Sequence, residues 1–129
     1  MKYIYPATFT KEKDGGFSVS FPDLKGAHTC GDNLEEALFM AQDCLGFILY
    51  GMEEDKEKFP SASKIAGYKN SDEKFTNLIS IDLSEYKKRV DDKPIRKTLY
   101  IPKYLNDKAE AAGVNFSALL RQTLEKKLG

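Results

Sequence analysis

Residues 93–102 read Lys-Pro-Ile-Arg-Lys-Thr-Leu-Tyr-Ile-Pro and begin the C-terminal segment of a 129-residue chain. We expect a short strand over 96–101 and two short amphipathic helices in the residues that follow. One strand and two such helices cannot bury a core alone, because an apolar stripe stays uncovered. A second copy of the same segment is the simplest cover, so the stretch predicts an obligate dimer with an outward-facing strand.

The expected strand separates its side chains by the two-residue period of β-structure. Leu99 and Ile101 lie on one side, and Arg96, Thr98 and Tyr100 lie on the other. A guanidinium, a hydroxyl and a phenol all suit the donors and acceptors on DNA base edges. Threonine and tyrosine are equally common on a half-buried edge strand, so the strand alone leaves both interpretations open.

The helices carry further information. Pro102 suits the first turn of a helix that Gly113 would end, and a second helix would begin near Asn115. An asparagine cap followed by Ser117 leaves amides and a hydroxyl free at a positive helix end, which favours phosphate binding. The positions expected to be buried are Leu105, Ala109 and Ala112 in the first helix, and Phe116, Leu119, Leu120, Leu124 and Leu128 in the second.

These features together resemble the ribbon-helix-helix DNA-binding domain, in which strands of two copies pair into an antiparallel ribbon that enters the major groove. The resemblance implies base contacts by Arg96, Thr98 and Tyr100. It also implies phosphate contacts by Asn115, the backbone of Phe116, and Ser117. Lys97 departs from the pattern, since the family often has an apolar residue there. We expect either a frayed ribbon or a lysine that reaches the DNA phosphates. The residues that carry the resemblance are Leu99–Pro102, Leu105, Ala109, Gly113, Asn115, Ser117, Leu119 and Leu120.

Composition and charge divide the chain in two. A length of 129 residues with 41% hydrophobic content predicts one core of about 80 to 90 residues and a small second module. Residues 93–129 carry eight basic and three acidic side chains, a net charge of +5, whereas the first 92 residues carry −5. A basic module suits a polyanion, and an acidic module suits a basic protein.

Targeting signals and cysteine content indicate the cellular compartment in which the protein is expected. No apolar run approaches the roughly 18 residues that span a membrane, and no secretory signal pattern is present, so we expect a cytoplasmic protein. Cys30 and Cys44 are too few for a disulfide framework and are expected to be reduced.

The first 83 residues predict an α+β fold. Alternating patterns over 3–10 and 17–21 flank Asp14-Gly15-Gly16 and indicate a β-hairpin. Three further elements are expected in this domain. They are a short strand over 27–30, a long amphipathic helix capped by Asp32 or Asn33 and ending near Gly51, and a strand over 79–83. We expect an antiparallel sheet of three or four strands with the helix on one face. Residues 53–74 read as a loop, and 84–92 as the linker, although a short helix is compatible with the latter.

Motifs in this domain resemble the HicB family of antitoxins, some of which end in a ribbon-helix-helix domain. They are Tyr5-Pro6-Ala7, Gly15–Val19, Phe21-Pro22-Asp23-Leu24-x-Gly26, Gly31-Asp32-x-x-Glu35-Glu36-Ala37 and Phe59-Pro60-Ser61. The resemblance implies a partly degenerate ribonuclease H-like fold and a non-catalytic inhibitor. It implies that residues 1–83 bind HicA, a small basic toxin that cleaves mRNA. The ribbon-helix-helix (93–129), dimeric or in a higher oligomer, would repress the operon through operator DNA.

The residues themselves do not favour an enzyme. The strand over 3–10 lacks the acid that a two-metal ribonuclease needs, and turn or cap roles suffice for Asp23, Asp32 and Asp82. His28, Cys30 and Cys44 are too few for a tetrahedral metal site, and His28 with Cys30 lacks accompanying oxyanion donors. We expect no cofactor, metal or catalytic residue. The alternatives are a ribbon-helix-helix regulator with a ligand-sensing N-terminal domain, and a metal-dependent ribonuclease.

Overall fold

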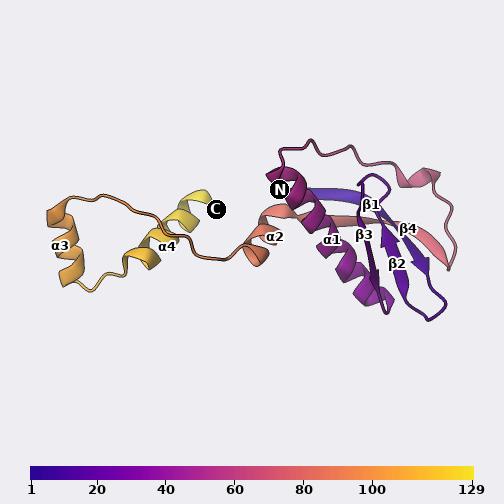
Figure 1. Ribbon diagram of the computed structural model, residues 1–129, viewed down its shortest axis with the longest axis horizontal. Helices are drawn as coiled ribbons and strands as arrows, with labels where there is room; N and C mark the ends of the chain where they lie inside the picture. Colours follow the sequence, from indigo (N-terminus) through magenta and orange to yellow (C-terminus); the bar gives the residue numbers. More distant parts are fainter. The chain divides into compact units, whose positions relative to one another are not determined.

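A computed structural model describes residues 1–129 and divides them into two compact units, Met1–Lys93 and Pro94–Gly129 (Figure 1). We call them unit 1 and unit 2 and describe each by itself. Unit 1 contains a four-stranded sheet and two helices, and unit 2 contains two further helices. The α+β class expected from the sequence is confirmed.

Unit 1 is built on an antiparallel sheet of strands β1 (Lys2–Lys11), β2 (Phe17–Ser20), β3 (His28–Gly31) and β4 (Lys74–Asp82). The strand order is β3-β2-β1-β4, so the last strand pairs with the first. The β1–β2 turn contains Gly15 at a φ of 93°, a conformation that glycine adopts without strain. The amide of Gly16 donates to Asp14 Oδ1 at 2.9 Å, which closes the turn. The hairpin predicted from the sequence is therefore confirmed.

The long helix α1 (Leu34–Glu54) starts at a reciprocal cap. Asn33 Oδ1 accepts from the Glu36 amide at 2.8 Å, and Glu36 Oε1 accepts from the Asp32 amide at 3.2 Å. Asn33 is thus the cap among the two candidates. The helix continues past Gly51 to Glu54, because nothing at Gly51 forces a left-handed turn.

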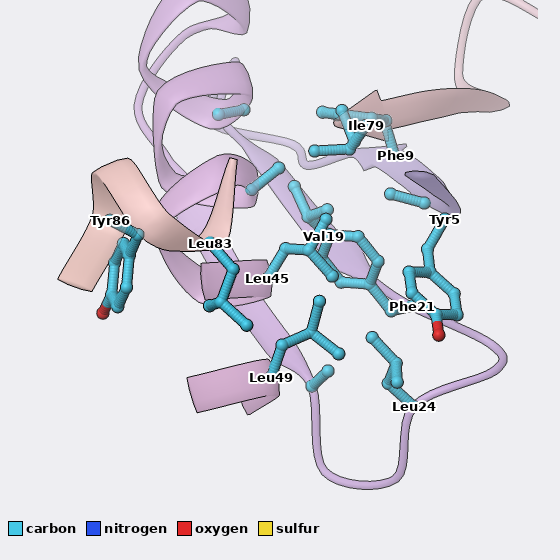
Figure 2. Close-up of a cluster of buried hydrophobic side chains, with 14 residues drawn as sticks. Tyr5, Phe9, Val19, Phe21, Leu24, Leu45, Leu49, Ile79, Leu83 and Tyr86 are labelled. Atoms are coloured by element: carbon cyan, nitrogen blue, oxygen red, sulfur yellow. The ribbon is translucent and has the colours of Figure 1, made fainter. Parts of the chain in front are cut away.

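The core of unit 1 lies between α1 and the sheet (Figure 2). Leu45 and Leu49 of α1 are fully buried, as are Phe9 of β1 and Val19 of β2. Removing these side chains from water supplies most of the driving force for folding of this unit. Other members of the same cluster come from the β2–β3 loop, β4 and the segment after β4, namely Phe21, Leu24, Ala27, Ile79, Leu83 and Tyr86.

Strand β4 begins five residues earlier than the strand expected at Ile79. Phe75 faces Phe9 across the β1–β4 pair, and their rings stack with centroids 5.2 Å apart. Polar residues between Lys74 and Leu78 conceal this in the sequence, since the strand lies at the edge of the sheet and keeps part of its length exposed. The rest of the expected loop is irregular apart from one turn of 3-10 helix, η1 (Ile65–Gly67).

Residues expected to act as a linker instead form helix α2 (Leu83–Val90), which packs on α1. Tyr86 is 5% exposed, and its ring lies over Gly46 so closely that a Cβ there would stand 2.5 Å from the ring. Lys87 pairs with Glu53, and Arg89 pairs with Asp43 at 3.5 Å. The compact unit therefore extends to Lys93, beyond the boundary expected at residue 83.

Unit 2 contains α3 (Lys103–Ala111) and α4 (Phe116–Leu128). Pro102 precedes the first helix, and Gly113, at a φ of 71°, follows it. The Gly113 amide donates to Glu110 O and the Val114 amide to Ala109 O, both at 3.0 Å, which satisfies the last carbonyls of α3. Both helices predicted for this segment are present.

Two glycines of α1 provide a matched test of the α1–α2 packing. We expect Gly46→Ala to lower the free energy of unfolding by about 1 to 3 kcal/mol, because the new methyl group would overlap the Tyr86 ring. Gly51→Ala meets no atom within 4 Å and should raise it by about 0.5 to 1 kcal/mol through helix propensity. Urea unfolding of both variants measures the difference. Stabilisation by both substitutions would contradict the docking of Tyr86 on Gly46.

Candidate functional site

The segment expected to form a DNA-binding strand is irregular in the single chain. Residues 91–102 belong to no helix or strand, and no backbone group of residues 95–101 forms a hydrogen bond. Tyr100 is 96% exposed. A strand exists only through ladder bonds to a neighbouring strand, and no strand of unit 2 lies beside this one. The strand expected over 96–101 therefore stays a prediction that requires a partner.

The apolar stripe of unit 2 is uncovered in the single chain. Neither α3 nor α4 has a buried residue. Positions expected to lie in a core are exposed, among them Leu105, Phe116, Leu119, Leu120, Leu124 and Leu128. An exposed apolar surface of this kind is typical of surfaces at which proteins associate.

The start of α4 presents free amides at the positive end of a helix. Asn115 Oδ1 accepts from the Ala118 amide at 3.0 Å, so the predicted cap is confirmed. The first intrahelical bond runs from the Leu119 amide to Asn115 O at 3.0 Å. The amides of Phe116 and Ser117 form no hydrogen bond within the chain, so they remain available to an acceptor.

No interaction within the chain joins the two groups of expected DNA contacts. Arg96, Lys97, Thr98 and Tyr100 lie on the irregular segment, and Asn115 to Ser117 lie at the start of α4. No hydrogen bond or ion pair involves the side chains of the first group. Any shared surface therefore depends on how the segment becomes ordered.

The surface of unit 1 contains a groove that the sequence did not reveal. It has a volume of about 620 Å³ and lies between the C-terminal half of α1, the β2–β3 loop and the segment that follows α1. Its apolar lining is Leu24, Phe47, Ile48, Met52 and Pro60. We call it the α1 groove.

Two motifs far apart in the sequence meet at the α1 groove. Asp23 Oδ2 accepts from the Ser63 amide at 2.8 Å, and the Ser63 hydroxyl also binds this carboxylate. The Tyr5 hydroxyl donates to Pro60 O at 2.5 Å, and the Tyr3 and Phe59 rings meet edge to face with centroids 5.0 Å apart. These contacts hold residues 59–63 against β1 and the β2–β3 loop, so that the Phe-Pro-Asp-Leu and Phe-Pro-Ser motifs lie next to each other.

The carboxylates and thiols considered for catalysis occupy structural positions or stand apart. Asp82 caps α2 by accepting from the Ser84 and Glu85 amides, and the bond from Glu85 contributes most to lowering its pKa. Both cysteines are free; burial, with a smaller contribution from Asp43, raises the pKa of Cys44. No group of three or more His, Cys, Asp or Glu side chains comes together in a way that could hold a metal ion. None of the helices is both long and apolar enough to cross a membrane.

Comparison with known proteins adds the relatives of this arrangement. Residues 5–123 match the family model of the HicB-like antitoxins of bacterial toxin–antitoxin systems. A 14.9 kDa protein from the rep–hol intergenic region of Haemophilus phage HP1 is 34% identical over 84 residues, which cover 63% of this chain and 62% of the phage protein. Antitoxin HicB 1 of Photorhabdus laumondii is 48% identical over 56 residues, 43% of this chain and 36% of that protein. The chain thus spans less than two thirds of these relatives.

Two solved structures resemble the chain over nearly its whole length. A chain of a toxin–antitoxin complex from Streptococcus pneumoniae is 28% identical, with a TM-score of 0.62, and the match covers 98% of this chain and 99% of that one. The antitoxin HicB of Burkholderia pseudomallei matches with the same coverage, at 19% identity and a TM-score of 0.54. The second likeness concerns the fold alone.

Tyr50 provides a pH-dependent test of the contact that ends α2. Its hydroxyl donates to Asp91 Oδ2 at 2.6 Å, and this bond is the main reason that its pKa is raised from 10.0 to about 12. Because the folded state holds this proton more tightly, the stabilisation is complete below pH 10 and is lost as the pH rises to about 12. We expect the absorbance titration at 295 nm to contain a component near pH 12, and we expect Asp91→Asn, which removes the carboxylate and keeps the phenol, to move that component toward pH 10. An unchanged titration in Asp91→Asn would contradict the contact.

Proposed function

The chain belongs to the HicB-like antitoxins of bacterial toxin–antitoxin systems, and from this premise we propose that unit 1 binds a HicA-type toxin while unit 2 binds operator DNA. The observation that carries the proposal is the span of the family match, which runs from residue 5 to residue 123 and so includes both units. The likeness to the Streptococcus pneumoniae chain also extends over both.

Inhibition by unit 1 is best explained by occlusion. The acidic balance of the first 92 residues attracts a basic, RNA-binding surface and would speed its association. Once bound, the antitoxin would block the approach of mRNA to the toxin. We infer no catalytic step by the antitoxin itself, which acts by steric occlusion of the toxin.

Dimerisation of unit 2 would supply what the single chain lacks. Pairing of residues 96–101 with the same residues of a second copy satisfies backbone groups that have no partner in the chain. The same association covers the exposed leucines of α3 and α4. We infer a ribbon-helix-helix dimer, because a single event would meet both requirements.

Operator binding follows from which side chains such a ribbon presents. Leu99 and Ile101 would face the helices, whereas Arg96, Thr98 and Tyr100 would face the base edges of the major groove. The free amides of Phe116 and Ser117 and the hydroxyl of Ser117, with Asn115 as the cap, would hold a DNA phosphate. Lys97 would lie on the same side of the ribbon strand as Leu99, and its long side chain would extend along the ribbon toward the DNA backbone phosphates.

Toxin neutralisation can be tested with the purified chain and a HicA-type toxin. We expect the two proteins to co-purify, and we expect RNA cleavage by the toxin to stop when the antitoxin is added in equimolar amount. Addition of small metabolites should leave the thermal stability of the free antitoxin unchanged. Stabilisation by a metabolite, without any effect on the toxin, would favour the alternative of a ligand-sensing regulator.

Replacement of the proposed DNA contacts separates sequence reading from phosphate binding. Arg96→Ala should lose about 1 to 3 kcal/mol on the cognate operator and little on unrelated DNA. Ser117→Ala should weaken binding to all sequences alike, because phosphates carry no sequence information. Binding isotherms on operator and scrambled duplexes at one salt concentration measure both. Unchanged operator binding by Arg96→Ala would refute the ribbon assignment.

A further inference from the structure

We propose that the α1 groove is the part of unit 1 on which the toxin docks, and that it takes an apolar side chain flanked by lysine or arginine from the toxin. This inference rests on the proposed function, which identifies the partner as a small basic protein. It adds the surface and the chemistry of the contact.

The groove contains an exposed apolar surface. Phe47 is 68% exposed on one wall, and the lining behind it contains buried Leu24 and half-buried Ile48 and Met52. Gly51, one turn after Phe47, adds no side chain, so the wall remains open beside the ring. An exposed aromatic residue beside an apolar hollow is the usual composition of an interface anchor point.

The charges around the groove specify a basic occupant. Helix α1 contains five acids, Glu35, Glu36, Asp43, Glu53 and Glu54, and no lysine or arginine. Acids at its C-terminal end face the negative pole of the helix dipole, where cations are favoured. Glu53 is paired with Lys87, but Glu54, Asp55 and Glu57 at the groove form no ion pair. Four acids line the groove, Asp23, Glu54, Asp55 and Glu57, against two lysines, Lys25 and Lys58. Lys56 lies between Asp55 and Glu57, so these residues together keep one negative charge, added to the negative balance of unit 1 as a whole.

The walls of the groove are held in place before any partner binds. The contacts of Asp23 with Ser63 and of Tyr5 with Pro60 fix one wall to the sheet, and α1 forms the other. A preformed site loses little conformational entropy on binding, so a smaller ordering cost is subtracted from the affinity. A second copy of unit 1 is a poor occupant by comparison, since it carries the same negative balance.

Two exposed phenylalanines of α1 provide a matched experiment. Phe47 lies in the α1 groove, and Phe39, 59% exposed on the same helix, lies outside it. We propose to measure the dissociation constant between the full chain and an inactivated variant of the HicA-type toxin. We expect Phe47→Ser to weaken toxin binding by about tenfold or more, and Phe39→Ser by less than about threefold. Operator binding should be unaffected by either substitution.

Charge reversal tests the second half of the proposal. Glu54→Lys should weaken toxin binding and flatten its dependence on salt, because fewer opposite charges approach each other. Glu35→Lys, at the other end of α1, is the matched control and should change both quantities much less. Equal effects at the two ends would show a general attraction to unit 1 and would overturn the groove as the site.

The remaining outcomes separate this inference from the proposed function. If the unaltered chain neither binds nor neutralises the toxin, the proposed function fails. If the unaltered chain binds but Phe47→Ser and the charge reversal bind equally well, or if Phe39→Ser alone loses binding, the docking surface is wrong and the function stands. A change in operator binding by Phe47→Ser would instead identify the basic unit 2 as the occupant, which also overturns the proposal.

Discussion

The pairing of β1 with β4 is the constraint on which the rest of unit 1 depends. It joins Lys2–Thr10 to Lys74–Asp82 along nine residue pairs, across more than sixty intervening residues. Because Asp82 then lies opposite Lys2, the chain can turn directly into α2, which Asp82 caps. The position of α2 in turn brings Tyr86 over Gly46 and Asp91 to Tyr50. The place where the chain leaves unit 1 is thus determined by a strand register far from it.

Unit 2 has no comparable constraint within one chain. Its helices are formed by local signals, the proline before α3, the glycine after it and the asparagine cap of α4. Local signals produce helices but cannot cover their apolar faces, and short helices without packing are marginal in water. The two units therefore differ in how they treat their apolar surface: unit 1 buries it through long-range strand pairing, whereas the apolar faces of α3 and α4 stay exposed in the single chain.

Local patterns in the sequence predicted most elements, and long-range packing explains what they missed. The β1–β2 hairpin, the long helix with its cap and the two C-terminal helices follow from alternation, helical spacing and capping residues near each other in sequence. Residues 84–92 were expected to be a linker or a short helix, and the sequence did not decide between them. Only Leu83 and Tyr86 mark the buried side of α2, and Gly46, the residue against which Tyr86 packs, lies forty positions away. The start of β4 was missed because Phe9, the residue that pairs with Phe75, lies sixty-six positions before it.

The α1 groove could not be found in the sequence for a related reason. Its motifs, around Asp23 and around Pro60, are visible as short runs, but their meeting depends on the Tyr5 hydroxyl and the Ser63 amide, which belong to neither run. Charge provides the one sequence signal, since a 21-residue helix with five acids and no base is unfavourable at its own C-terminus. In the free chain, the last turn of α1, next to Phe47, contains acids and none of the lysines or arginines that would stabilise this helix end. A basic partner would supply such cations, and we therefore assign the acidic end of α1 and the apolar wall of the groove to one proposed binding surface.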